Sequence, residues 1–271
     1  RGYGTEVTIV EAMSNLLPFN DKEISEELEK IFKKKGIKIL TDKQVTGFKE
    51  NGKELETVLK SGESLSSEYV LFSIGREADL SCVEGLDIKQ DRGRLIVNDY
   101  METSIEGVYA AGDINGISML AHSAFKMGEA AAGNALGGRE EVRVENTPKC
   151  VYTLPEIASV GLTEEEALKK YGKIRTGRFN FGANGRAIAS SEEEGFVKVI
   201  CDDKYGEILG VHIIGSKATE MISAGVILME MEITIEEASE IIYAHPTFSE
   251  AILEACADCL GKALHLPKKK M

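Results

Sequence analysis

The chain has 271 residues, of which 43% are hydrophobic and 28% are charged, and its formal net charge at neutral pH is −13. This length allows one to three domains with a large buried core, whereas the acidic balance disfavours nucleic acid and anionic membranes as partners. No apolar run approaches the roughly 20 residues that cross a bilayer, and no charged and apolar leader opens the sequence. We therefore expect a cytoplasmic protein that binds neither, with the basic residues Lys268 to Lys270 as a solvated terminus.

The cysteines indicate packing rather than a metal or disulfide site. Their number is odd, which suits a reducing compartment. Cys256 and Cys259 form C-x-x-C, but the surrounding apolar residues recur at helical spacing and place both thiols on one buried stripe. Redox pairs of this kind usually begin a helix, and no second pair completes a zinc site. We predict a packing role for both cysteines and no metal site.

The first segment has the order strand, helix, strand. "EVTIVEA" (6–12) is an apolar β-branched strand, "NDKEISEELEKIFKKKG" (20–36) is an amphipathic helix, and "IKIL" (37–40) is a second strand. Asn20 and Glu23 form a possible helix cap, and Gly36 is a stop signal. Short links between such elements are typical of a parallel sheet.

Later elements are expected as follows. Residues 54–74 form a meander whose last strand, 69–74, is buried and stops at Gly75 and Arg76. A further strand, 107–113, ends in Gly112 and Asp113, and a helix rich in small residues covers 119–138. An acidic residue at the carboxyl end of a strand occupies the usual ligand position of open α/β sheets.

From about residue 149 the pattern changes to strands followed by helices, an α+β layer. A capped helix starts at Thr163 to Glu166, strands cover 195–202 and 207–215, and helices cover 217–230 and 234–243. The motif "YAHPTFSE" (243–250) precedes a final helix.

Five motifs in order carry a resemblance over essentially the whole chain: "YAAGDINGISMLAHSAFKMGEAAAGNALGG", "VYTLPEIASVGLTEEEA", "GVHIIGSKATEMI", "YAHPTFSEAILEA" and "GKALHLPKK". Together they resemble the pyridine nucleotide-disulfide oxidoreductases, and most closely the dihydrolipoamide dehydrogenase group. The resemblance implies an α/β fold in which partial Rossmann-type NAD- and FAD-binding segments precede an α+β interface domain. Residues 1–76 would be the latter part of the NAD domain, 77–147 the returning FAD segment and 148–271 the dimerisation domain.

The resemblance also implies roles for individual residues. Glu11 would bind the NAD ribose, a role that an acidic residue ending a strand has in dinucleotide-binding units. Val45 and Gly75 would line the same site, and Asp113 would contact the ribityl or phosphate region of FAD. A last group would lie along the flavin: Met119, Leu120, Ala121 and His122.

His245 is implied to be the general base that takes a proton from a dithiol substrate, with Glu250 orienting it and a cis bond before Pro246. Imidazole suits this role because it titrates near neutral pH, and a carboxylate on its other nitrogen fixes the tautomer. His212 and His265 are expected to be structural. The carboxylate of Glu11 favours the free 2′-hydroxyl of NAD over the 2′-phosphate of NADP.

Three motifs of the family's reaction are absent from this sequence: an N-terminal G-x-G-x-x-G for FAD, a redox-active C-x-x-x-x-C and a second glycine fingerprint for NAD. We therefore expect the C-terminal portion of a homodimeric enzyme that passes electrons from a lipoyl-bearing protein through FAD to NAD, without turnover in isolation. Two alternatives stay open, a related flavin disulfide reductase with another thiol substrate and a non-catalytic dimerisation module.

Overall fold

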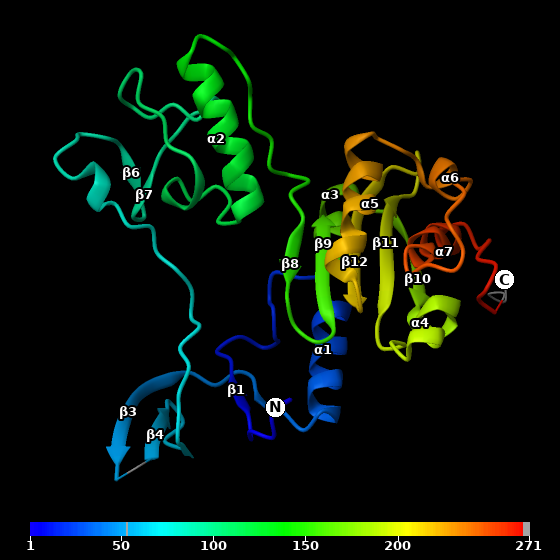
Figure 1. Cartoon of the computed structure of the whole chain (residues 1–271), viewed down its shortest axis with the longest axis horizontal. Helices are drawn as coiled ribbons and strands as arrows, with labels where there is room; N and C mark the ends of the chain where they lie inside the picture. The colour runs from blue at the N-terminus through cyan, green and yellow to red at the C-terminus, as the bar shows by residue number, and fades with distance from the viewer. Residues whose placement is uncertain (53, 268–271) are drawn as a thin grey trace. The chain divides into compact units, whose positions relative to one another are not determined.

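The computed structural model describes residues 1–52 and 54–267, so the basic stretch Lys268 to Lys270 lies outside the described residues. The chain divides into two compact units, one made of Arg1–Leu71 with the chain from Pro148 onward, the other of Phe72–Thr147 (Figure 1). The first 71 residues thus pack with the C-terminal region. The three-part division at 76 and 147 stays a prediction.

The first segment has the predicted order of elements. β1 (Thr8–Val10) and β2 (Lys38–Leu40) pair in parallel, connected through α1 (Lys22–Lys34). The predicted helix cap was wrong by one residue, because Asp21 accepts the Glu23 N–H at 3.1 Å. Asn20 instead accepts from the Ser159 hydroxyl at 3.4 Å. Gly36 follows the last turn with φ +76°, a left-handed conformation that ends the helix as predicted.

A three-stranded antiparallel meander follows, made of β3 (Val45–Asn51), β4 (Glu54–Leu59) and β5 (Ser64–Ser67). The buried strand predicted over 69–74 was wrong. That stretch has no strand pairing, and Tyr69, Leu71 and Ile74 are about nine-tenths exposed. A strand needs a neighbour for its backbone groups and a layer for its side chains, and the described residues place neither beside this segment.

The C-terminal region contains a five-stranded antiparallel sheet of order β10-β11-β12-β9-β8. Its strands are β8 (Lys149–Val151), β9 (Glu156–Gly161), β10 (Ile174–Asn180), β11 (Phe196–Asp202) and β12 (Ile208–Gly215). The helices are α3 (Glu164–Tyr171), α4 (Gly185–Ser190), α5 (Ala218–Glu230), α6 (Ile235–Ala238) and α7 (Glu250–Cys259). The α+β layer is confirmed, although α6 ends well before residue 243.

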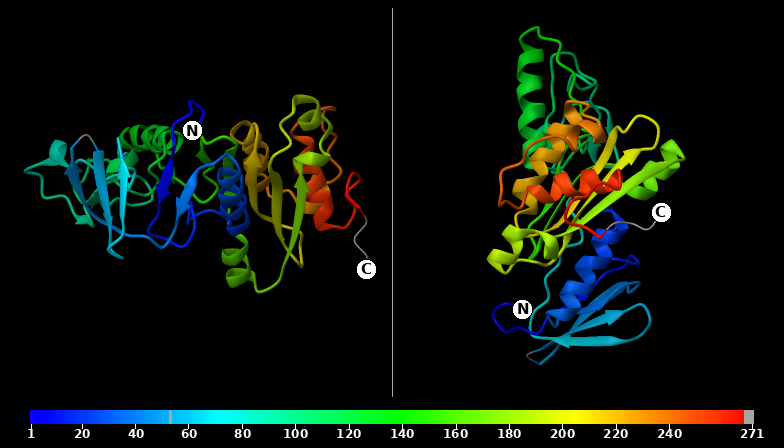
Figure 2. Two further views of the ribbon diagram at one scale, coloured as in Figure 1. Left: turned by 90° about the horizontal axis from the view of Figure 1, so that it is seen from below. Right: turned by 90° about the vertical axis from the view of Figure 1, so that its right-hand side faces the viewer.

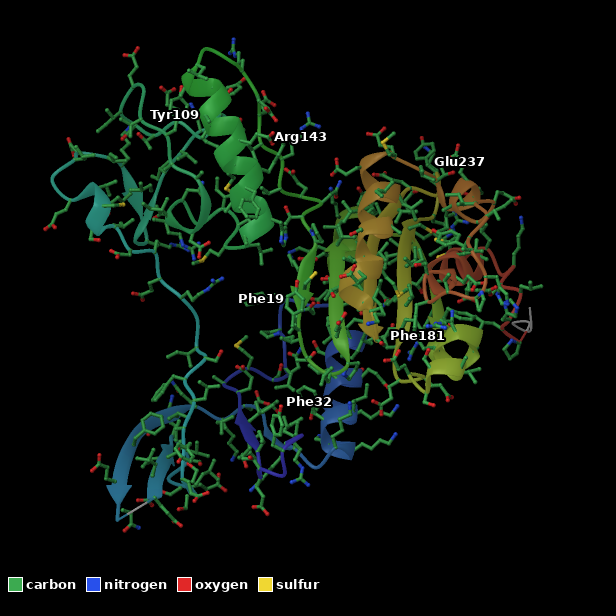
Figure 3. The ribbon with its side chains drawn as sticks, viewed as in Figure 1. Phe19, Phe32, Tyr109, Arg143, Phe181 and Glu237 are labelled. Atoms are coloured by element: carbon green, nitrogen blue, oxygen red, sulfur yellow. The ribbon has the colours of Figure 1, made fainter. Side chains whose placement is uncertain are left out.

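Helices cover both faces of this sheet, as Figures 1 and 2 show. Every residue of β11 and β12 is buried. Alternate residues such as Val199 and Ile213 face α5 and α7 and form the largest core. Phe196 and Ile214 point the other way and meet Ile24 of α1, with Phe32 (Figure 3) packed at the edge of that second cluster.

An ion cluster centred on the buried side chains of Lys198 and Asp21 accompanies this second interface. Lys198 Nζ of β11 lies 3.0 Å from Asp21 Oδ1, 2.7 Å from Glu23 Oε1 and 2.5 Å from Glu164 Oε2. Asp21 also accepts the Glu164 N–H at 3.0 Å. One ammonium therefore links the start of α1, the start of α3 and the sheet. Each charge has a close partner of opposite sign, which burial requires.

The second unit contains η1 (Ser81–Val83), β6 (Gln90–Asp91), β7 (Arg94–Leu95), η2 (Gly112–Ile114) and α2 (Ala121–Ala135). The helix predicted over 119–138 is confirmed as α2. The strand predicted over 107–113 was wrong, since Tyr109 makes only an isolated bridge to Glu102 and Gly112 turns at φ +81°. A positive φ is incompatible with an extended strand. Among the described residues, no helix has the length and apolar content needed to span a membrane.

Candidate active site and cofactor-binding residues

His245 and Glu250 form a hydrogen-bonded pair just before and at the start of α7. Nδ1 of His245 lies 2.8 Å from Glu250 Oε1, so the imidazole donates through Nδ1 to the carboxylate. This bond leaves Nε2 as the nitrogen with a lone pair. The histidine side chain is 73% exposed and that of Glu250 only 20%. The pair thus consists of an exposed imidazole, with one nitrogen able to accept a proton, and a less exposed carboxylate that holds the ring through its other nitrogen.

The loop before α7 holds the carboxylate in place. The His245–Pro246 peptide bond is cis, as the resemblance implies. Thr247 donates its N–H to Glu250 Oε2 at 2.7 Å, while its carbonyl accepts from the Asn184 side chain at 3.0 Å. Partial burial acts to raise the pKa of Glu250, but the Thr247 N–H and the His245 ring outweigh it and hold that pKa below its usual value. Glu250 therefore stays ionised beside the imidazole.

The supporting role of Asn184 was not anticipated from the sequence. Asn184 caps α4 by accepting the Ala187 N–H at 2.9 Å, and its amide donor reaches Thr247 across 63 residues of chain. An asparagine before "GRAIAS" signals a helix cap. Nothing in the local sequence signals the second contact.

Two other histidines, His212 and His265, were predicted to be structural, and both have internal partners. His212 in β12 is 1% exposed and bonds through Nε2 to the Leu162 carbonyl at 2.9 Å. His265 bonds through Nδ1 to Glu254 Oε1 at 2.8 Å. The second pair repeats the geometry of His245 and Glu250 on the same helix, outside the H-P-T-x-S-E motif.

Glu11 directly follows β1 and continues its pairing with β2. Its N–H bonds to the Leu40 carbonyl at 2.9 Å, and its Oε1 accepts the Met13 N–H at 2.7 Å. The side chain is half-buried, and no residue in the described part of the chain bonds to Oε2. An anchored carboxylate with one uncommitted oxygen fits ribose hydroxyls, which donate hydrogen bonds.

The remaining residues predicted for the nicotinamide site fall in both units. Val45 opens β3 in the same unit as Glu11 and is half-buried. Gly75 belongs to the unit that begins at Phe72, where it is exposed with φ +119°. Their joint role with Glu11 stays a prediction.

The residues predicted for the flavin lie together in the second unit, on η2 and at the start of α2. Arg76 organises them, since its NH1 lies 3.6 Å from Asp113 Oδ2 and its NH2 donates to the Met119 carbonyl at 2.8 Å. Asp113 is 46% exposed. Leu120 is the helix cap residue and has intermediate exposure, and Ala121 and His122 are exposed. A half-exposed carboxylate beside an exposed helix start fits hydroxyl and phosphate groups of a nucleotide cofactor.

From the sequence, Arg76 was interpreted only as part of a strand stop. Its position directly after Gly75 gives no sign of the two contacts made 37 and 43 residues later in the chain. Long-range ion pairs of this kind carry no local sequence signal.

The predicted roles of the cysteines agree with the structure where it tests them. All five are free thiols. Cys256 and Cys259 are buried on α7, within the core that faces β11. The described residues contain no group of ligating side chains that could hold a metal ion.

Two family models match the chain. Residues 1–128 match the model for pyridine nucleotide-disulphide oxidoreductases, and residues 147–256 match the model for the dimerisation domain of the same proteins. Among curated proteins, a dihydrolipoyl dehydrogenase of Rhizobium etli is 36% identical over 98% of this chain and 57% of the relative. One from Bacillus subtilis is 39% identical over 97% of this chain and 57% of its own length.

Solved structures agree with these matches. LpdA from Mycobacterium tuberculosis superimposes with a TM-score of 0.86 at 28% identity, covering 94% of this chain and 56% of LpdA. The flavoprotein disulfide reductase RclA from Escherichia coli, with a TM-score of 0.88 at 24% identity, shows the shared fold. The chain spans somewhat more than half of the length of the relatives it matches, and it belongs to the pyridine nucleotide-disulfide oxidoreductase family.

Proposed function

We propose that this chain supplies the C-terminal portion of a flavin-dependent dihydrolipoyl dehydrogenase, with His245 as the general base. The observation that carries the proposal is the 2.8 Å bond between His245 Nδ1 and Glu250 Oε1, which leaves Nε2 of this 73% exposed side chain with its lone pair. The curated relatives at 34–39% identity, which carry the name dihydrolipoyl dehydrogenase, favour a dihydrolipoyl substrate over another dithiol.

A dithiol must lose protons before its sulfur can attack a disulfide, because the thiolate is the nucleophile. In the proposed reaction Nε2 of His245 accepts the proton of the attacking thiol. The imidazolium that forms is stabilised by Glu250, whose carboxylate already accepts from Nδ1. The Thr247 N–H fixes the second carboxylate oxygen, so the ring is held in one orientation while the proton moves.

The family uses FAD and NAD, and the proposed reaction assigns both to the complete enzyme. FAD would lie against Asp113 and the residues from Met119 to His122, and Glu11 would hold the NAD ribose with Val45 and Gly75. These cofactors supply the electron transfer from the reduced disulfide centre to the nicotinamide. Toward these cofactors the chain contributes binding groups, and Arg76 holds Asp113 and the Met119 carbonyl in fixed positions.

The proposed partners are a second copy of the chain, through the region that matches the dimerisation model, and a protein that carries the lipoyl group. The cytoplasmic location stays a prediction from composition. Because this sequence contains no C-x-x-x-x-C pair, we expect the 271-residue chain alone to show no turnover with dihydrolipoamide.

The test compares two half-reactions in the flavin-loaded enzyme that contains this chain. His245→Gln should reduce NAD-dependent oxidation of dihydrolipoamide by about two to four orders of magnitude, the usual contribution of a general base. Flavin reduction by NADH, followed between about 350 and 500 nm, should be largely retained because it needs no proton from a dithiol. Equal losses in both half-reactions would refute the assignment of His245.

Flavin binding and dithiol oxidation by the enzyme that contains this chain also distinguish the proposed function from that of a non-catalytic dimerisation module. The C-terminal region builds its largest core, between the sheet and the helices α5 and α7, from its own residues, an observation that favours independent folding of a dimerisation domain. A dimer that binds no flavin and oxidises no dithiol, whatever chain completes it, would favour that alternative.

A further inference from the structure

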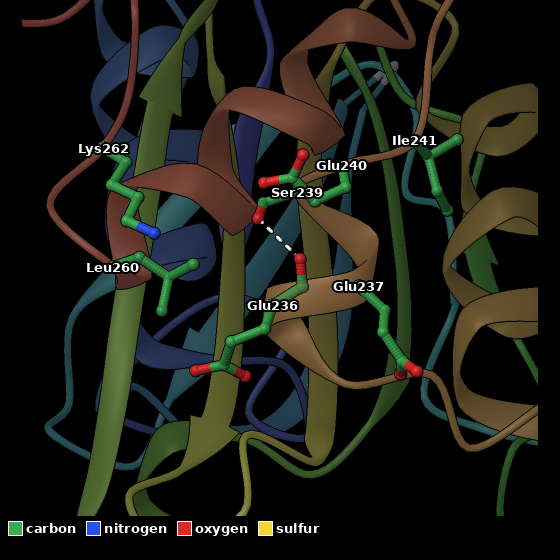
Figure 4. A pocket seen from close by; sticks show the side chains of 7 residues that line it. All are labelled: Glu236, Glu237, Ser239, Glu240, Ile241, Leu260 and Lys262. Carbon is green, nitrogen blue, oxygen red and sulfur yellow. Dashed lines mark hydrogen bonds between the residues drawn. The ribbon is translucent and has the colours of Figure 1, made fainter.

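A surface pocket of about 470 Å³ lies between α6 and the residues that follow α7 (Figure 4). Its polar side chains are already used within the fold. Glu236 Oε1 lies 3.4 Å from NH1 of Arg175, and Glu237 Oε2 accepts both the N–H and the hydroxyl of Thr234. The Ser239 hydroxyl donates to the Glu236 carbonyl at 2.8 Å. These groups stabilise α6, and they point to no ligand.

Asparagines that precede glycine carry a reactive amide instead. The sequence contains three such pairs, Asn51–Gly52, Asn115–Gly116 and Asn184–Gly185. In each pair the backbone nitrogen of the glycine is positioned to attack the side-chain amide carbon, because glycine has no side chain to hinder the approach and little restriction of its backbone angles. The same two residue types form all three pairs, so the fold decides which pair reacts.

The fold uses every reacting group of the second pair. Asn115 is 6% exposed, its Nδ2 donates to the Ala110 carbonyl at 3.1 Å, and its Oδ1 accepts the Ile117 N–H at 3.0 Å. The N–H of Gly116 donates to the Asp113 carbonyl at 3.1 Å. Ring closure at Asn115 therefore has to break buried hydrogen bonds of both partners.

The third pair is held in a similar way. Asn184 is 3% exposed, its Oδ1 accepts the Ala187 N–H at 2.9 Å, and its Nδ2 donates to the Thr247 carbonyl at 3.0 Å. Both polar atoms of the amide are thus bonded inside the C-terminal region. Rotation of this amide toward the nitrogen of Gly185 would leave buried donors and acceptors without partners.

Asn51 has none of these restraints. It is the exposed last residue of β3, and no residue in the ranges 1–52 and 54–267 bonds to its side-chain amide. Gly52 is exposed with φ +67°, and a Cβ atom added to it would meet no described atom within 4 Å. The exposed end of a hairpin opens locally at low cost. The amide of Asn51 can therefore turn to the glycine nitrogen while the rest of the meander stays folded.

We propose that Asn51 is a site of spontaneous deamidation, where the native protein accumulates aspartate and isoaspartate while Asn115 and Asn184 keep their amides. Either product adds a negative charge, and isoaspartate also lengthens the backbone at the residue that pairs with Glu54. The inference does not depend on the proposed function, because the reaction needs neither flavin nor nicotinamide.

The reaction balances with water as its only co-reactant. The nitrogen of Gly52 loses its proton to hydroxide and attacks Cγ of Asn51, a C–N bond forms, and the side-chain nitrogen leaves as ammonia with a proton from water. A second water opens the resulting succinimide. Cleavage of the bond to Cγ gives aspartate, and cleavage of the bond to the main-chain carbonyl carbon gives isoaspartate. One amide becomes one carboxylate and one ammonia, without oxidation or reduction.

The test incubates the protein that contains this chain at mildly alkaline pH under native conditions and follows each asparagine by mass spectrometry of peptides. An isoaspartyl carboxyl methyltransferase with a labelled methyl donor counts the isoaspartate separately. We expect Asn51 to lose its amide at least about tenfold faster than Asn115 and Asn184, because the other two must first break buried hydrogen bonds. In urea, which removes this protection, all three should react at similar rates.

Two controls separate the glycine from exposure alone. Asn180 is also exposed but precedes Phe181, and it should keep its amide in the native protein. Asn51→Gln should abolish the rapid release of ammonia, because ring closure onto the longer side chain is much slower. Equal native rates at the three pairs would overturn the proposal, as would isoaspartate that forms first at Asn115 or Asn184, or an Asn51 that reacts only in urea.

Discussion

The ammonium of Lys198 lies 3.0 Å from Asp21 Oδ1 although the two side chains are only 2% and 1% exposed. The pair joins strand β11 to the residue that caps α1, across 177 positions of sequence. It holds together two segments of the chain between which the whole second unit is inserted.

Removing the lysine should be costly because it leaves Asp21 as a buried charge without its cation. Lys198→Met should lower the free energy of unfolding by about 3 to 5 kcal/mol, as measured by urea denaturation. Lys173→Met is a suitable control, since its amine pairs with Asp203 while 81% exposed. Equal changes in the two variants would show that the buried cluster adds nothing to stability.

His212 predicts a pH dependence of stability. Burial is the main cause that lowers its pKa, only partly offset by Asp21, the Leu162 carbonyl and Glu166, while Lys198 lowers it further. The unfolded chain therefore binds this proton more readily, so the stabilisation is present above the unfolded value of about 6.5 and is lost as pH falls below it. Urea midpoints between about pH 7 and 5 should decrease in the natural sequence. His212→Gln should have a shallower slope, and an identical slope would exclude His212 as the source.

Glu250 should matter for catalysis through orientation of the imidazole. Glu250→Gln in the flavin-loaded enzyme should decrease kcat for dihydrolipoamide by about 100-fold or more with little change in flavin reduction by NADH. Glu254→Gln is the matched control, because Glu254 accepts from His265 at the same 2.8 Å on the same helix. Comparable losses in both variants would indicate damage to α7 rather than to the base.

Glu11 should set the preference between NAD and NADP. Glu11→Gln removes the charge that repels a 2′-phosphate, so KM for NADH should rise and discrimination against NADPH should fall by about tenfold. Glu6→Gln, an exposed change ahead of the same strand, should leave both constants unaltered. An unchanged ratio of kcat/KM for the two cofactors in Glu11→Gln would refute this role.

Gly177 tests the packing of α7 on the sheet. Gly177→Ala should lower the free energy of unfolding by about 1 to 3 kcal/mol, because the new methyl group overlaps the Ala255 carbonyl. Gly47→Ala in β3 places its methyl group in open space and serves as the comparison. Thermal midpoints for both variants distinguish overlap from the general effect of a methyl group.

Local sequence patterns predicted those helices and strands whose signals, such as capping residues and apolar runs, lie within the element itself. The capping box of Thr163 and Glu166 and the strands predicted over 195–202 and 207–215 are visible in the sequence and are confirmed by the cap of α3 and by β11 and β12. The prediction of a buried strand over 69–74 was wrong, because an apolar run indicates burial but does not identify the part of the chain that would cover it. His245 and Glu250 could be paired from their motif, whereas the contacts of Asn184 with Thr247 and of Arg76 with Asp113 depend on distant segments.

The docking of α1 has a consequence for biosynthesis. Ile24 and Leu28 are buried against Phe196 and Ile214, which are made more than 160 residues later. At about 5 to 20 residues per second, translation leaves the apolar face of α1 without its final partner for roughly ten seconds or more. During that interval the nascent chain exposes an aggregation-prone amphipathic helix, and a chaperone that shields its apolar face would act before the sheet has formed.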